Sequence, residues 1–299
     1  MRKAVIDVGS NSVLLLVAEP GGKTVFESSE VTGLGTDTKL TGLIRSDAQE
    51  LTLAAIKRGF DKAHELGAEC RAAGTMALRI ATNAPDFLQA AKEQGTPVDI
   101  ISGDEEARLG LAAVMTDPFF KDHPVISVID PGGHSTELTT ASRTPNGWQE
   151  TYKRSVPVGA LGLLEGAMSE ESPGFAARLK AVTEIDDAIG LEYRPGQAGT
   201  AVALGATPTN LVTIREKMTG WDAEKVHGQY LDYEEVSKAV AWMCDMTLSE
   251  RAAIVGLEKG REKTLHIGAL ILERFLNSCH VLGCFVSTRG WRHALLEEN

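Results

Sequence analysis

Two copies of one short segment constrain the fold of this chain more than any other feature of its sequence. The segment Ile6–Ser12 matches the segment Ile129–Ser135, and Asp130 follows Asp7 by 123 residues. In both copies an apolar run ends at the aspartate, and a glycine and a serine follow at the same spacing. This pattern is typical of a strand, a tight turn and a second strand. Two such units indicate two related domains whose loops face each other across a cleft, with two unrelated β-hairpins as the alternative.

The second copy has the composition of a loop that binds phosphate. Gly132 and Gly133 let backbone N–H groups turn toward a ligand with no Cβ in the way. Two hydroxyl donors and a carboxylate follow them: Ser135, Thr136 and Glu137. Carboxylates beside phosphate are most useful when they hold a divalent cation or a water. Asp130 would supply a second carboxylate. A turn-initiating aspartate is the alternative reading of Asp130.

The rest of the chain alternates between strand and helix patterns. Strands are predicted at 3–9, 12–18, 23–29, 68–73, 98–101, 125–130, 135–141, 148–156 and 284–287. Helices are predicted at 46–67, 104–115, 159–168, 174–191, 205–217, 233–245 and 261–278, and also from Asn83 and from Arg289 onward. Ser46 and Asn83 are the expected caps. The apolar face of the first helix is expected at Leu51, Ala54, Ala55 and Phe60. This order indicates an α/β fold with mixed sheets.

The segment from Asp117 to Pro124 is the best candidate for a domain boundary. It holds two prolines and several charges between two periodic segments. We therefore predict an N-terminal domain of residues 1–122 and a C-terminal domain of residues 123–299. This division allows the terminal helix of the second domain to pack onto the first domain.

Composition excludes several classes of function. The formal net charge is −11 and aromatic residues make up 5%, which argues against a nucleic-acid partner. The same charge means that a polyanion must bind through a local positive patch or through metal ions. No apolar stretch reaches 18 residues and Asp7 interrupts the first one, so we expect no membrane segment and a cytoplasmic protein. The cysteines are expected to be free thiols, with a metal site at Cys279, His280 and Cys284 as the weaker alternative.

Four stretches, in this order, resemble the Ppx/GppA family, the exopolyphosphatases and guanosine pentaphosphate phosphatases of the actin/Hsp70/sugar-kinase superfamily. They are 4–12, Gly74–Arg79, Ile101–Leu109 and the Asp130 loop, with weaker echoes at 156–160, Gly199–Ala201, Val226–Gly228 and Gly268–Leu270. The length is similar to that of the short, two-domain members. The resemblance implies two actin-like (ribonuclease H-like) domains, with mixed sheets flanked by helices and the active site in the interdomain cleft.

The resemblance also implies roles for individual residues. The glutamate before Ala-Arg, here Glu106, is the family's general base, and Glu137 is a second catalytic candidate. Asp130 and Glu137 would hold Mg²⁺ or another divalent cation. The predicted substrate-binding residues are Asp7, Gly9, Ser10, Asn11, Ser12, Arg79, Gly132, Gly133, His134, Ser135, Thr136, Gly199 and Thr200.

Each of these roles has a plain structural alternative. Helical spacing places Glu106 on the face of Leu109, Gly110 and Ala113, whereas Glu105 is expected to be a solvated partner of Arg108. Both glutamates would also simply favour the positive end of a helix. Arg79 would grip two phosphate oxygens or form an interdomain salt bridge. His227 is expected to be structural.

Three positions depart from the family pattern: His134 replaces a glycine, Pro131 an apolar residue and Leu14 a polar one. The imidazole of His134 would either block the amide cradle or, if charged, donate to phosphate. The preferred function is removal of the terminal phosphate of inorganic polyphosphate or pppGpp by metal-assisted attack of water. The alternatives are a catalytically weak (p)ppGpp- or polyphosphate-binding sensor and a sugar-kinase-like transferase. The sequence leaves open the choice of substrate and the oligomeric state, a homodimer included.

Overall fold

The computed structural model describes residues 1–190 and 197–298 of the chain. These residues form two compact units, Met1–Leu109 with Trp291–Asn299, and Gly110–Gly290. The chain passes into the second unit within helix α5 (Gly103–Met115) and returns to the first at helix α13 (Trp291–Glu297). The first passage therefore lies upstream of the proline-containing segment 117–124.

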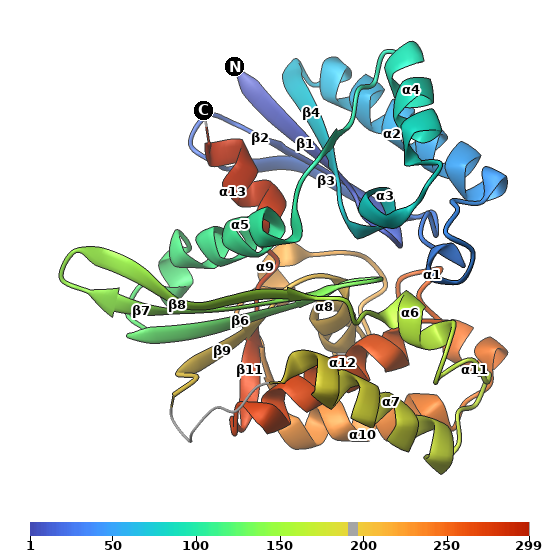
Figure 1. The fold of residues 1–299 in the computed structure, drawn as a ribbon. Helices are drawn as coiled ribbons and strands as arrows, with labels where there is room; N and C mark the ends of the chain where they lie inside the picture. Colours follow the sequence, from blue (N-terminus) through green and yellow to red (C-terminus); the bar gives the residue numbers. More distant parts are fainter. Residues whose placement is uncertain (191–196, 299) are drawn as a thin grey trace. The chain divides into compact units, whose positions relative to one another are not determined.

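The first unit is built on a five-stranded sheet of order β3-β2-β1-β4-β5. Its strands are β1 (Arg2–Val8), β2 (Ser12–Ala18), β3 (Thr24–Val31), β4 (Ala68–Gly74) and β5 (Asp99–Ile100). Strand β1 is antiparallel to β2 and parallel to β4, so the sheet is mixed. Five consecutive residues of β1 are buried because helices cover both faces of this strand. Helix α2 (Ser46–Glu65) packs on β1, β2 and β4, and α13 packs on β1 and β2 (Figure 1).

The second unit holds a six-stranded sheet of order β10-β11-β9-β6-β7-β8. Its strands are β6 (Val125–Pro131), β7 (Thr136–Thr144), β8 (Gly147–Val156), β9 (Thr200–Ala203), β10 (Tyr230–Asp232) and β11 (Gly283–Val286). Helix α12 (Leu265–Ser278) is buried over most of its length, because α7 (Phe175–Ile189), α8 (Ala206–Arg215) and α10 (Tyr233–Cys244) contact it.

The remaining elements are short. They are α1 (Thr38–Thr41), α3 (Met76–Ile80), α4 (Ala84–Glu93), η1 (Pro118–Phe120), α6 (Ala160–Leu164), α9 (Ala223–Val226) and α11 (Leu248–Ala252). Sequence periodicity missed α1, α3, η1, β9, α9, β10 and α11, each of which has five residues or fewer. Elements of this length do not complete two helical turns or a full alternation, so their periodic signal is weak. The predicted end of α7 at residue 191 lies outside the described residues.

The predicted cap Ser46 is wrong, Asn83 occupies its predicted cap position without a capping hydrogen bond, and the predicted apolar face of α2 is only partly confirmed. Helix α2 begins at Ser46 itself, with Arg45 in the cap position. Asn83 does occupy the cap position of α4, but its side chain bonds instead to the backbone N–H and C=O of Ile44. In α2, Leu51 is 58% exposed. The residues that α2 actually buries are Ala48, Thr52, Ala55, Ile56, Gly59 and Ala63.

The internal repeat is confirmed at the level of hydrogen bonds. Gly9 N donates to Ser12 O over 2.9 Å, and Gly132 N donates to Ser135 O over the same distance. Strand β6 pairs antiparallel with β7 and parallel with β9, as β1 does with β2 and β4. The two segments are therefore equivalent parts of two related mixed sheets, and the fold class predicted from the sequence is confirmed.

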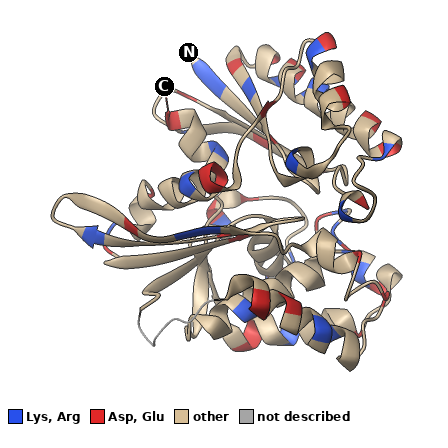
Figure 2. Cartoon of the chain, in the orientation of Figure 1, with Lys and Arg blue, Asp and Glu red and all other residues tan. Residues whose placement is uncertain are grey.

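Charged residues are spread over the outer helices. Figure 2 shows acidic and basic residues interspersed along helices such as α2, α7 and α10. Within the described part of the chain, no helix has both the length and the apolar character needed to cross a membrane.

Candidate active site

The turn of the second unit, Asp130–Glu137, brings two carboxylates together; we call it the Asp130 turn. Asp130 and Glu137 are direct partners in the antiparallel β6–β7 pair. Directly opposed residues project from the same face of a sheet, with Cβ atoms about 4.5–5.5 Å apart. Glu137 is 5% exposed, and its Oε1 accepts a hydrogen bond of 2.7 Å from Ser155 on β8. The predicted metal-binding pair is thus a pair in space as well.

The carbonyl groups of the Asp130 turn face helix α6. Gly132 O accepts from Ala160 N, and Gly133 O accepts from Leu161 N over 2.7 Å. The approach is so close that a Cβ added at Gly159 would lie 2.5 Å from the Gly133 backbone. The first amides of α6 therefore bind carbonyl oxygens of the turn and do not bind a ligand anion.

The Thr136 hydroxyl has a structural role. Thr136 is completely buried, and its Oγ1 donates to Val158 O over 2.7 Å. It ties the turn to the residues before α6, so its hydroxyl hydrogen is not directed at a substrate as the sequence had suggested.

His134 contradicts both expectations that were drawn from the sequence. Its side chain is 0% exposed, and Nε2 lies 3.7 Å from Oε1 of Glu165, a side chain that is 7% exposed. A completely buried imidazole neither presents an N–H to a solvent-borne phosphate nor stands in front of the turn. The side chain instead packs under the turn, on the side of α6.

Gly199 and Thr200 lie at the wrong end of the sheet for the predicted role. Thr200 pairs with Ile126 at the start of β6, whereas Asp130 lies at the other end of that strand. The Thr200 hydroxyl is hydrogen-bonded to Nδ1 of His123 over 2.8 Å. The structure therefore does not bring these two residues to the Asp130 turn.

The residue that does reach the Asp130 turn from β9 is Gly205. It lies two residues after the end of the strand at Ala203 and has φ +80° and ψ −170°. A Cβ at this position would lie 2.6 Å from Asp130 Oδ1. The available signal was Gly-Ala-Thr after the apolar run 200–204, a strand that ends in glycine before a helix. Asp130, Glu137 and Gly205 thus form one end of the second unit's sheet.

The equivalent turn of the first unit, Asp7–Leu14, is built differently. Asp7 is 7% exposed and is opposed across the strands by Leu14, where the second unit has Glu137. Its charged neighbour is Arg292 of α13, whose NH1 lies 3.4 Å from Asp7 Oδ2. The cation next to this aspartate is a guanidinium from the far end of the chain, which sequence reasoning missed.

The predicted base and the predicted phosphate-binding arginine are ion-paired with each other. Arg79 NH1 lies 3.1 Å from Glu106 Oε2 and also donates to Ile101 O over 2.8 Å. The two side chains are 17% and 12% exposed. The ion pair is internal to the first unit, which contradicts the interdomain salt bridge as its explanation. Glu105 pairs with Arg108 at the surface, as predicted.

A hydrogen bond connects this ion pair to the first turn. Ala77 N, in the same short helix α3 as Arg79, donates to Ser10 Oγ over 3.2 Å. The first unit therefore brings together Ser10 of the turn, α3 with Arg79, and Glu106 in the first turn of α5.

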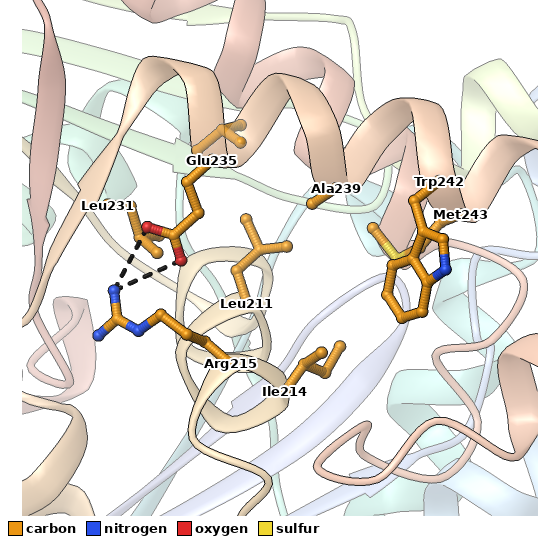
Figure 3. Close-up of a pocket in the computed structure, with 9 residues that line it drawn as sticks. Leu211, Ile214, Arg215, Leu231, Glu235, Ala239, Trp242 and Met243 are labelled. Carbon is orange, nitrogen blue, oxygen red and sulfur yellow. Dashed lines mark hydrogen bonds and ion pairs between the residues drawn. The ribbon is translucent and has the colours of Figure 1, made fainter.

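One apolar cavity of about 220 Å³ lies between α8 and α10 (Figure 3). Its wall includes Leu211, Ile214, Val236, Trp242 and Met243. At its rim, Arg215 is paired with Glu235, and none of the predicted site residues lines it. The cavity is therefore separate from the candidate site.

The fold and these turns define the class of the protein. Two related mixed sheets, each with an aspartate-and-glycine turn after its central strand, make it a two-unit actin-like α/β protein. The model of the Ppx/GppA phosphatase family matches residues 16–298, and the chain belongs to this family.

Known relatives agree with this assignment. Exopolyphosphatase 2 of Mycobacterium tuberculosis is 25% identical over 91% of this chain and 89% of its own length. The bifunctional 3-dehydroquinate synthase/phosphatase of Fusobacterium nucleatum is 28% identical, and the match covers 92% of this chain but only 43% of that relative. The crystal structure of the Aquifex aeolicus Ppx/GppA family member is 29% identical with a TM-score of 0.80, covering 100% of this chain and 97% of that one. An exopolyphosphatase from Cytophaga hutchinsonii, 22% identical with a TM-score of 0.87, has the same fold.

Proposed function

We propose that this member of the Ppx/GppA phosphatase family removes the terminal phosphate of inorganic polyphosphate or pppGpp by in-line attack of water. The observation that carries the proposal is the Arg79–Glu106 pair, with NH1 and Oε2 3.1 Å apart in a half-buried setting. A carboxylate held in place by a guanidinium can orient a water and accept its proton. The same guanidinium has further N–H groups that can meet phosphate oxygens.

The Asp130 turn fits a divalent cation. Mg²⁺ keeps several waters and usually takes one or two protein carboxylates together with substrate oxygens. Asp130 and Glu137, directly opposed across β6 and β7, are such a pair. No cluster of three or more His, Cys, Asp or Glu side chains suited to a metal is found within residues 1–190 and 197–298, so substrate oxygens would complete the shell. When bound, the cation would neutralise phosphate charge, which a chain of net charge −11 requires.

Backbone groups of the two turns are proposed to bind phosphate. In the Asp130 turn, the first amides of α6 bind the carbonyls of Gly132 and Gly133, and the Gly132 amide donates to Ser135 O. The backbone N–H groups that follow Gly132 are the proposed phosphate donors. Gly205 takes the place that the sequence had assigned to Gly199 and Thr200. In the first unit, Arg292 is the proposed second cation, oriented by Asp7.

Phosphate release in the presence of Mg²⁺ tests the proposal. Polyphosphate, pppGpp and ATP are offered to the wild type, to Glu106→Gln and to Glu105→Gln. Glu105 is the matched control, because it is the neighbouring glutamate of the same helix but is paired at the surface with Arg108. We expect Glu106→Gln to lose roughly 100-fold or more in rate and Glu105→Gln to be unaffected. Equal losses in both variants, or none in either, would contradict the assignment of Glu106.

A binding role without efficient turnover is the second candidate. It is favoured by the first turn, where Leu14 opposes Asp7 in place of a carboxylate. A sensor would bind (p)ppGpp or polyphosphate tightly and release phosphate no faster than Glu106→Gln does. Calorimetric titration beside the release assay separates the two functions.

A further inference from the structure

A polar cluster around one buried carboxylate in the second unit lies outside the turns described above. We call it the anchor cluster: Thr116, Asp117, His227, Thr288 and Arg289. It joins the residues that follow α5 to the residues that precede α13. Asp117 is 4% exposed, so its charge must be compensated within the protein.

Asp117 is held from three directions. Its Oδ1 accepts a hydrogen bond of 3.0 Å from Phe119 N, and its Oδ2 lies 3.2 Å from His227 Nε2. Arg289 Nε lies 4.0 Å from the same oxygen. Burial by itself would raise the pKa of Asp117, but His227, the Phe119 amide and Arg289 outweigh it and lower the pKa. Arg289 also donates from NH2 to Thr116 Oγ1 over 3.1 Å.

The contact at the second ring nitrogen, Nδ1, shows which nitrogen of His227 accepts a hydrogen bond and which one donates. Thr288 N lies 3.3 Å from Nδ1 and donates to it. A backbone N–H is always a donor, so Nδ1 is the acceptor and the ring proton of neutral His227 is on Nε2, which faces Asp117. The imidazole therefore links the carboxylate after α5 to the backbone before α13.

Aromatic packing holds the imidazole in this position. The His227 ring meets the Phe119 ring edge-on, with centroids 5.6 Å apart and an interplanar angle of 79°. Gly228 has φ +75°, and a Cβ there would lie 2.6 Å from the Phe119 ring. Its N–H donates to Val286 O over 2.8 Å. This histidine-glycine pair accordingly has little freedom to move.

The two segments that the cluster joins are the two passages of the chain between its units. Helix α5 carries Glu106 in its first turn and ends just before Thr116. The segment at Thr288 and Arg289 leads within three residues to Arg292, the neighbour of Asp7. We infer that His227 and Asp117 are positioning residues for the proposed hydrolysis, since they fix the end of the helix that bears Glu106 and the start of the helix that bears Arg292. This inference rests on the proposed function.

The test compares His227→Ala, His227→Gln and Asp117→Asn with the wild type and with His64→Gln, a change at an exposed histidine of α2. Glutamine can place a side-chain N–H near the position of Nε2, so His227→Gln is the conservative rescue. We measure kcat and KM for phosphate release, thermal stability, and amide hydrogen exchange. We expect His227→Ala and Asp117→Asn to lower kcat roughly 10- to 100-fold, as a small displacement of reacting groups does. KM is expected to rise as well, because the displaced α13 bears Arg292, a proposed substrate contact. His227→Gln is expected to regain most of both losses.

Hydrogen exchange separates failure of this inference from failure of the proposed function. In His227→Ala, amide exchange should accelerate at both passages, at residues 115–119 and 287–292, and remain unchanged in α2. Acceleration at neither passage, or at both with an unchanged kcat, would overturn the positioning role. If the wild type releases no phosphate, the proposed function fails. The exchange at residues 115–119 and 287–292 alone then decides whether the cluster holds the end of α5 and the start of α13 in place. Should His227→Ala fail to fold, the isosteric Asp117→Asn is judged by the same criteria.

Discussion

Gly205 offers the sharpest test of how the second unit is built, because its replacement by alanine disturbs one carboxylate in a defined way. Its backbone, at φ +80° and ψ −170°, lies in a region that only glycine adopts readily. A non-glycine residue there costs on the order of 1–3 kcal/mol. The new Cβ would in addition lie 2.6 Å from Asp130 Oδ1, so the carboxylate must turn away from its present position.

The expected result of Gly205→Ala is a lower melting temperature together with a weaker response to metal. A loss of 1–3 kcal/mol corresponds to roughly 2–4 °C per kcal/mol in a chain of this size. Thermal unfolding is followed with and without Mg²⁺, and phosphate release is titrated with Mg²⁺. Gly220→Ala is the matched control, since Gly220 is exposed and a Cβ there meets nothing within 4 Å. A Gly205→Ala protein with wild-type stability and wild-type dependence on Mg²⁺ would refute the reasoning.

Three further predictions follow from buried charged and polar groups. His134→Gly should leave phosphate affinity unchanged at acidic pH. It should lower the free energy of unfolding, measured by denaturant titration, by roughly 2–5 kcal/mol, because a completely buried side chain is lost. Weaker phosphate binding without that loss of stability would restore the imidazole as a phosphate donor. Arg292→Met should raise KM for the substrate. It should also destabilise the first unit by about 3 kcal/mol or more, since buried Asp7 loses its ion pair with the Arg292 guanidinium. An unchanged KM would remove Arg292 from the proposed site. Burial, and secondarily Arg251, lowers the pKa of His266 to about 3. The unfolded chain therefore binds the proton first, and the free energy of unfolding should fall as pH drops from about 6.5 toward 3. His266→Phe should flatten that part of the stability-pH profile, and an unaltered profile would assign the acid lability to other groups.

The local pattern of the chain was sufficient for the turns and for the general fold. Asp7, Asp130 and Glu137 lie where their strand-turn-strand motifs predicted, because a period of two and a glycine turn specify local geometry without tertiary information. The helical spacing of Glu106 likewise predicted its inward direction, and the structure leaves that side chain only 12% exposed.

The predictions that failed concern direction and partners. Gly-Thr at residues 199–200 matched a loop motif, but a strand has two ends, and only the parallel pairing of β9 with β6 places Gly205 beside Asp130. The role of His134 depended on which way the side chain turned, and burial under α6 decided that. A motif carries no information on either point, because both depend on residues distant in sequence.

The sequence by itself determined that this chain holds two related strand-turn-strand units of the Ppx/GppA type, since the spacing of acids, glycines and hydroxyls along a strand is a local property. Only the tertiary structure decided which charges meet. Arg79 pairs with Glu106 across 27 residues, and Arg292 reaches Asp7 across 285. The physical reason is that ion pairs form wherever packing excludes water and brings opposite charges close, and packing is set by the whole fold.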